Sequence, residues 1–158
     1  MKLTHFDKAG SARMVDVSEK EVTVRTAVAE GEINMSAETM RLIREGQLSK
    51  GDVLQVARIA GVMGAKATPD LIPLCHPIPL DKVEVEFEEL DESTLKVQAT
   101  ARATFKTGVE MEALTAATIA GLTVYDMCKS ADRAMTLGPF YLVEKTGGKS
   151  GHFKREED

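Results

Sequence analysis

The amino-acid sequence predicts an α+β fold, in which an antiparallel sheet is covered by helices on one face. Two observations predict the sheet: apolar residues alternate with polar ones at 22–28, and the same period recurs twice between 82 and 106. A third observation predicts the helices, because apolar residues follow a helical period near 36–46, 52–66 and 109–131. The order β-α-(α)-β-β-α-β is that of the split βαβ, or ferredoxin-like, sandwich.

The first strand is predicted where alternate residues should form a half-buried row: Val22, Val24, Thr26 and Val28. Ser36 then precedes a periodic segment that stops before Gly46, which predicts an N-capped helix of about three turns. A second helix is predicted from Asp52 to Lys66, with its apolar stripe at residues 53, 56, 57, 60 and 63.

Residues 82–106 are predicted to form an antiparallel hairpin. Its first strand alternates apolar residues with glutamates, a turn follows at Asp91-Glu92-Ser93, and a second alternating run extends from Leu95 to Ala103. The longest helix is predicted over 109–131, where many alanines and threonines suit close packing on a sheet. A last strand is expected around Phe140, Leu142 and Val143.

Length and composition favour a single domain over residues 1–158. A chain of 158 residues can bury a sizeable core without a disulfide or a metal. The segments at about 1–15 and 147–158 show no periodicity, so we expect mobile ends unless a ligand or partner orders them. No apolar run approaches the ~20 residues of a membrane span, so no membrane association is expected.

Charge and aromatic content argue against a nucleic-acid surface. The formal net charge is −5, and the chain has two Tyr, five Phe and no Trp. Cys75 and Cys128 lie far apart in a sequence without a secretory segment, so neither a disulfide framework nor secretion is expected. We therefore expect a cytoplasmic protein whose anionic ligand is small and is held by a local lysine cluster.

The segment LIPLCHPIPL at 71–80 should form a stiff loop, because three prolines exclude a regular helix or central strand. It presents Cys75 and His76. Cys128, His5 or His152 could complete a metal site with them, but no CxxC or HxxxH spacing occurs, so no bound metal is predicted. The histidine is expected to hydrogen-bond a ligand, or simply to be satisfied within the loop.

Asp126 and Lys129 lie three residues apart on the longest helix, so they share a face and are separated by ~4.5 Å of rise. The pair is either a solvated ion pair or an acid–base pair that exchanges protons. Spacing alone favours the ion pair. The soft or apolar neighbours Tyr125, Met127 and Cys128 indicate partial burial, which would allow acid–base tuning.

Glu110 and Glu112 lie at the start of the same helix, where the helix dipole favours carboxylates. Glu112 and Asp126 are fourteen residues apart and therefore ~21 Å distant along a continuous helix. If both are catalytic, either the helix breaks or the site lies between subunits. We therefore expect an oligomer with shared sites.

The segment EKTGGKSG at 144–151 is not a P-loop, because the Walker pattern requires glycine where Val143 stands. Its glycines lie between Lys145 and Lys149, so it could close over an anion or be an ordinary mobile tail. Lys50 and Lys66, taken separately, are typical surface lysines.

Several long motifs resemble those of the molybdenum cofactor biosynthesis protein C family (MoaC). They are LIPLCHPIPL, KTGVEMEALTAA, VYDMCK and KTGGKSG, with MVDVS at 14–18 and KGDVLQVARIAG at 50–61. The resemblance covers essentially the whole chain. It implies a cyclic pyranopterin monophosphate synthase, a lyase that converts (8S)-3′,8-cyclo-7,8-dihydroguanosine 5′-triphosphate into cyclic pyranopterin monophosphate and diphosphate.

The resemblance also implies an assembly and a metabolic partner. The subunits would form a homohexamer, a trimer of dimers, with sites at subunit interfaces. A radical SAM GTP cyclase would supply the substrate. Whether Mg²⁺ accompanies the triphosphate stays open, because the acidic residues have rival roles.

Residue roles follow from the motifs that match. The resemblance implies three catalytic residues, Asp126, Lys129 and Lys50. It implies contacts to the pterin-forming part of the substrate from Leu74, Cys75, His76, Glu110, Met111 and Glu112. It assigns the triphosphate end to Lys145, Gly147 and Gly148.

The reaction needs several proton transfers near neutral pH and stabilisation of departing diphosphate, and both suit clustered lysines. No covalent intermediate at Cys75 or Cys128 is predicted. Two other functions stay open: a carrier that binds a nucleotide or pterin without catalysis, and a metalloprotein.

Overall fold

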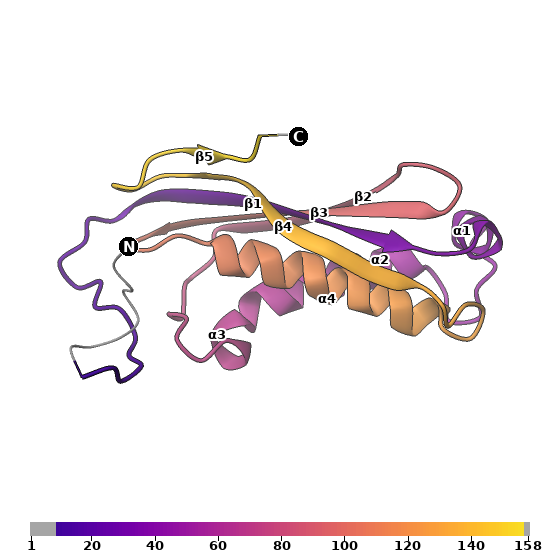
Figure 1. Cartoon of the computed structure of the whole chain (residues 1–158), viewed down its shortest axis with the longest axis horizontal. Coiled ribbons are helices and arrows are strands. Elements are labelled where there is room, and N and C mark those ends of the chain that lie inside the picture. The colour runs from indigo at the N-terminus through magenta and orange to yellow at the C-terminus, as the bar shows by residue number, and fades with distance from the viewer. Residues whose placement is uncertain (1–8, 157–158) are drawn as a thin grey trace.

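The computed structural model describes residues 9–156 and forms one antiparallel sheet with helices on one face (Figure 1). The sheet has five strands in the order β2-β3-β1-β4-β5. The strands are β1 Thr23–Asn34, β2 Lys82–Glu89, β3 Thr94–Phe105, β4 Thr136–Thr146 and β5 Phe153–Lys154. The order of the first four is that of the ferredoxin-like sandwich, so the predicted fold class is confirmed.

Within residues 9–156, four helices connect the strands: α1 Ala37–Arg44, α2 Val53–Lys66, α3 Thr68–Leu71 and α4 Glu110–Cys128. Figure 1 shows α2 and α4 side by side beneath the sheet, with α1 near one end of the strands. No helix within residues 9–156 combines the length and hydropathy needed to cross a lipid bilayer.

The predicted cap at Ser36 and the predicted turn at Asp91 form as expected, and Asp52 is a second cap that was not predicted. The Ser36 side chain accepts a hydrogen bond from the Thr39 amide at 3.2 Å, and Asp52 accepts one from the Gln55 amide at 3.1 Å. Helix α1 has 8 residues, which is fewer than the three turns predicted. In the β2–β3 turn, Asp91 Oδ1 accepts from the amide of Ser93 at 2.7 Å, and the predicted hairpin is confirmed.

The prediction for the buried face of β1 was wrong. Val22 and Val24 are 57% and 47% exposed, and the opposite row faces the helices: Arg25, Ala27, Ala29, Gly31 and Ile33. The Phe140 ring, which also lies against Gly121 of α4, is so close to Gly31 that a Cβ there would collide with it. The middle of the core face is therefore formed by the small residues Ala27, Ala29 and Gly31, and Val22 and Val24 do not belong to it.

The predicted stripe of α2 was also partly wrong. Val56 and Met63 are 42% and 63% exposed, whereas the buried row is Val53, Ala57, Gly61, Gly64 and Ala65. A Cβ at Gly61 would lie 3.0 Å from the Ala116 carbonyl oxygen of α4. The helix therefore turns its smallest residues toward α4, so that the two backbones can approach closely.

Two short elements were not predicted from the sequence. Helix α3 is a single turn with Pro69 near its start, and it leads into residues 72–80, which contain neither helix nor strand, as predicted for the proline loop. Strand β5 pairs with β4 through Glu144↔Lys154 and Lys145↔Phe153. The candidate ligand His5 lies outside the described residues, as do the other residues of 1–8 and 157–158.

Candidate active site

Two adjoining cavities open beside the N-terminal end of α4. The larger has a volume of about 720 Å³ and the smaller about 420 Å³. Both are lined by Lys20, Thr107, Gly108 and Glu110, so they share a wall. That wall lies where β3 ends and α4 begins.

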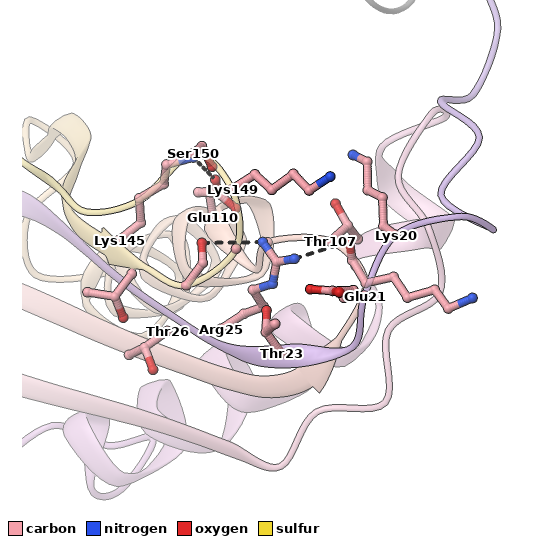
Figure 2. Close-up of a pocket in the computed structure, with 15 residues that line it drawn as sticks. Lys20, Glu21, Thr23, Arg25, Thr26, Thr107, Glu110, Lys145, Lys149 and Ser150 are labelled. Atoms are coloured by element: carbon pink, nitrogen blue, oxygen red, sulfur yellow. Dashed lines mark hydrogen bonds and ion pairs between the residues drawn. The ribbon is translucent and has the colours of Figure 1, made fainter.

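The larger cavity, here called the cationic pocket, is lined by five basic side chains: Lys20, Arg25, Lys106, Lys145 and Lys149. Figure 2 labels all of these except Lys106. Two carboxylates, Glu21 and Glu110, also line it. The basic residues are distant in sequence but close in space, because β1 is hydrogen-bonded to β3 on one side and to β4 on the other. The pocket therefore carries a net positive charge in an acidic protein.

Arg25 is only 8% exposed and belongs to the buried row of β1. Its Nη1 donates to the Gly147 carbonyl at 3.3 Å, and its Nη2 donates to the Lys106 carbonyl at 3.4 Å. Its Nε donates to the Phe105 carbonyl at 3.4 Å. None of these three acceptors carries a formal charge, so they hold the guanidinium in place without neutralising it.

Residues 147–150, here called the glycine loop, connect β4 to the turn before β5 and line the cationic pocket. Gly147 and Gly148 have φ values of +98° and +72°, which favour glycine. A Cβ at Gly147 would collide with the Val24 carbonyl, and one at Gly148 with the Arg25 guanidinium. Glycines at both positions therefore let the loop lie directly on β1.

Lys145 precedes this loop on β4, and its Nζ lies 2.7 Å from Oε1 of Glu110. Both side chains are 27% exposed. The ion pair connects β4 to the start of α4 across the pocket. The three residues assigned to the triphosphate end, Lys145, Gly147 and Gly148, all line the cationic pocket.

The smaller cavity, here called the proline-loop pocket, is lined on one side by Leu74, Cys75, His76 and Ile78. Val15 and Val17 line another side, and α4 contributes Met111 and Glu112. All six residues predicted to contact the pterin-forming part line this pocket: Leu74, Cys75, His76, Glu110, Met111 and Glu112.

His76 Nε2 lies 2.7 Å from the carbonyl oxygen of Val15. A carbonyl only accepts hydrogen bonds, so Nε2 carries a proton. In a neutral ring, Nδ1 is then the acceptor. The contact also ties the segment before β1 to the proline loop.

Glu112 is only 2% exposed, and burial raises its pKa to about 7, with a further upward contribution from the charge of Glu110. Both protonation states are therefore populated near neutral pH, as acid–base catalysis requires. The pKa of Cys75 is raised by burial and then by Glu112. Cys75 is therefore held as a thiol, which is a poor nucleophile.

Lys50, Asp126 and Lys129 form a second cluster, here called the triad. Lys129 Nζ lies 2.8 Å from Asp126 Oδ1, and Lys50 Nζ lies 3.2 Å from Asp126 Oδ2. Lys50 Nζ also donates to the Asp126 carbonyl at 2.9 Å. The loop before α2 thus brings Lys50 to the end of α4, which unites the three residues predicted to be catalytic.

The triad is exposed: its side chains are 42% exposed at Lys50, 58% at Asp126 and 51% at Lys129. Hydrogen bonds from Lys129 and then Lys50 lower the pKa of Asp126, and the bond to Asp126 raises the pKa of Lys129. The expected partial burial of the pair was wrong for the single chain. Met127 and Cys128 are buried in the core and do not cover the carboxylate.

Helix α4 is continuous from Glu110 to Cys128. Glu112 and Asp126 are therefore ~21 Å apart along the helix axis, and neither cavity includes the triad. Of the two arrangements expected if both residues are catalytic, the break in the helix does not occur. In the described part of the chain, no three His, Cys, Asp or Glu side chains are grouped so that they could hold a metal ion.

Sequence reasoning missed Lys20, Arg25 and Lys106 as residues of the cationic pocket. Only the strand pairing brings them together, so their spacing in sequence carried no signal. Arg25 did have one detectable feature. It is a charged residue in the same alternating row as Ala27 and Ala29, which indicates a functional reason for its burial.

The MoaC family model matches residues 14–148, a range that includes most of both cavities and the whole triad. The chain belongs to the MoaC family. The match ends within the glycine loop, at Gly148.

Relatives of this MoaC-family chain are similar over nearly their full length. A protein of Brevibacillus brevis is 58% identical over 156 residues, covering 99% of this chain and 98% of the relative. One of Heliobacterium modesticaldum is 59% identical over 157 residues, covering 98% of each. One of Thermomicrobium roseum is 55% identical, covering 99% of this chain and 95% of the relative. All three are named cyclic pyranopterin monophosphate synthase.

Proposed function

We propose that this chain is a cyclic pyranopterin monophosphate synthase that acts in molybdenum cofactor biosynthesis. It converts (8S)-3′,8-cyclo-7,8-dihydroguanosine 5′-triphosphate into cyclic pyranopterin monophosphate and diphosphate, and is thus a lyase. The name shared by relatives at 53–59% identity supports the activity. One structural observation supports the assignment of the substrate-binding residues: the nine residues predicted for this role line two adjoining cavities.

The two cavities suit the two ends of such a substrate. The triphosphate would occupy the cationic pocket, where Lys145, Lys149 and Arg25 offer charge and the glycine loop offers backbone amides. The purine-derived part would enter the proline-loop pocket, beside His76 and Glu112. The shared wall at Thr107 and Gly108 then lies near the ribose.

Closure of the cyclic phosphate expels diphosphate, and negative charge grows on the leaving group. Lys145 and Lys149 of the cationic pocket would stabilise that charge, because cations fixed before the reaction need no reorganisation. No protein nucleophile is required, which agrees with a Cys75 thiol whose pKa is raised. Mg²⁺ would enter with the triphosphate if it takes part, and an assay with and without a chelator decides this.

Proton transfers during ring rearrangement are assigned to Lys129, Asp126 and Lys50. In the single chain these side chains are solvated and paired, and Lys129 holds its proton more firmly than a free lysine. We infer that a neighbouring subunit brings its triad to the proline-loop pocket, where substrate and protein exclude water. Burial then lowers the pKa of a lysine toward the neutral range.

The family resemblance implies a homohexamer, a trimer of dimers, with sites between subunits, and we propose this assembly. The separation of ~21 Å between Glu112 and Asp126 along α4 supports sharing, because a single chain cannot place both at one small substrate. A radical SAM GTP cyclase would supply the cyclised nucleotide. We expect both enzymes in the cytoplasm.

The proposal is tested by incubating the purified protein with the cyclised dihydro-GTP intermediate. Release of diphosphate and the fluorescent oxidised pterin are followed together. Lys129→Ala and Asp126→Asn are the matched variants, because each removes one ionisable group of the exposed triad.

Wild-type turnover with loss of activity in both variants, at nearly unchanged substrate affinity, is the expected result. Tight binding by the wild type without turnover would instead indicate a carrier. Loss of affinity alone in the variants would contradict the catalytic assignment of the triad.

A further inference from the structure

Strand β5 folds back onto the residues that form the cationic pocket. It pairs Phe153 with Lys145 and Lys154 with Glu144, and the Arg155 amide donates to the Val143 carbonyl at 2.8 Å. The glycine loop therefore lies between two paired strands, β4 before it and β5 after it. A strand of two residues contributes little pairing of its own, so other contacts must hold it.

Arg155 supplies two of those contacts. Its Nε donates to the Leu142 carbonyl at 3.1 Å, and its guanidinium lies 4.8 Å from the centre of the Tyr141 ring. Tyr141 in turn donates to Glu30 of β1 at 3.4 Å. The side chain of Arg155 thus fixes the end of β5 to the sheet through a carbonyl and an aromatic face.

The glycine loop depends on the attachment of β5 to β4, because its glycines allow many backbone conformations. Gly147, Gly148 and Gly151 all have positive φ, and the space around a Cβ at Gly151 is open. On the β4 side the loop is held by the bond from Arg25 to the Gly147 carbonyl. On the far side, β5 and its contacts help to restrain Lys149 and Ser150, which line the pocket. The Gly151 amide donates to the Gly148 carbonyl at 3.1 Å, and His152 Nε2 lies 2.6 Å from Glu144 Oε1 on β4.

We propose that Arg155 is a positioning residue, which through β5 holds the glycine loop over the cationic pocket in the conformation that binds the diphosphate portion of the substrate. This inference rests on the proposed function. It adds a residue beyond 148, where the family match ends. Arg155 does not line the pocket, so it acts on the anion only through the loop.

The test measures binding of inorganic diphosphate to the full chain by calorimetry, together with KM and kcat. Arg155→Ala removes the contacts, and Arg155→Lys keeps the charge but loses the planar guanidinium. The matched control is Lys154→Ala, which removes one exposed positive charge from the residue just before Arg155. Hydrogen exchange at residues 153–155 reports whether β5 has opened.

If separation of β5 from β4 leaves only about a tenth of the molecules with the glycine loop in the binding conformation, the apparent Kd for diphosphate rises about tenfold. We expect this rise, faster exchange and a higher KM for both Arg155 variants, with kcat nearly unchanged. Lys154→Ala should resemble the wild type in all three measurements.

Three results would overturn the proposal. One is an unchanged Kd in Arg155→Ala although β5 exchanges faster, and another is unchanged exchange in that variant. The third is an equal loss of affinity in Lys154→Ala, which would make the effect one of net charge. Failure of the wild type to turn over substrate would overturn the proposed function, whereas the comparison of diphosphate affinities would still test the role of Arg155.

Discussion

Replacing Glu112 with glutamine should change how stability depends on pH. Burial raises the pKa of Glu112 from 4.5 to about 7. Between pH 4.5 and about 7, the Glu112 carboxyl keeps its proton in the folded state and releases it in the unfolded state. The unfolded state therefore binds fewer protons, and the free energy of unfolding falls as pH rises from 4.5 toward 7.

The raised pKa corresponds to about 3 kcal/mol of lost stability above neutral pH. Glu112→Gln has nearly the same volume and no ionisable group, so this loss disappears. Relative to the wild type, the variant should gain about 3 kcal/mol between pH 4.5 and about pH 8. Urea unfolding at both pH values measures the gain, with the chain concentration held fixed because assembly also affects stability.

Glu110→Gln is the control for the cause of the shift. Burial is the first cause of the raised pKa and the charge of Glu110 is a smaller one, so this variant should keep most of the pH dependence. A relative gain below about 1 kcal/mol in Glu112→Gln would refute the reasoning, because the carboxylate would then be solvated or paired in the folded protein.

Three further predictions concern subunit sharing, helix packing and the glycine loop. Mixing inactive Glu112→Ala and Asp126→Ala chains should restore some diphosphate release, and no recovery in mixed oligomers confirmed by native mass spectrometry would exclude shared sites. Gly61→Ala should lower the free energy of unfolding in urea by about 1–3 kcal/mol, because its Cβ meets an α4 carbonyl at 3.0 Å; unchanged stability would contradict the close α2–α4 contact. Gly148→Ala should weaken diphosphate binding measured by calorimetry, since its φ of +72° disfavours alanine and its Cβ would collide with Arg25.

The fold was predictable because its signals are local. Capping by Ser36 and Asp52, the Asp91 turn and the alternation of β3 each depend on neighbouring residues. The face of β1 was not predictable in this way, since the valines formed the more visible pattern. The close approach of Phe140 to Gly31 selects the small-residue face, and that constraint exists only in the folded chain.

Recognition of the site depended on motifs rather than on geometry. The proline loop, Lys145 and the start of α4 could be named from the sequence, and all line the two cavities. Arg25 and Lys106 could not, because β-sheet pairing brings together residues about 80 positions apart. Strand β5 was missed because a strand of two residues has no detectable period.

The cationic pocket also bears on how a substrate arrives. The whole chain has a formal charge of −5, yet five basic and only two acidic side chains line this single opening. A highly charged nucleotide is repelled by the net charge of the chain and attracted by the local charge of this pocket, so diffusional encounters are steered toward it. The association rate should therefore fall steeply with ionic strength, even where the affinity of the fully formed complex changes less.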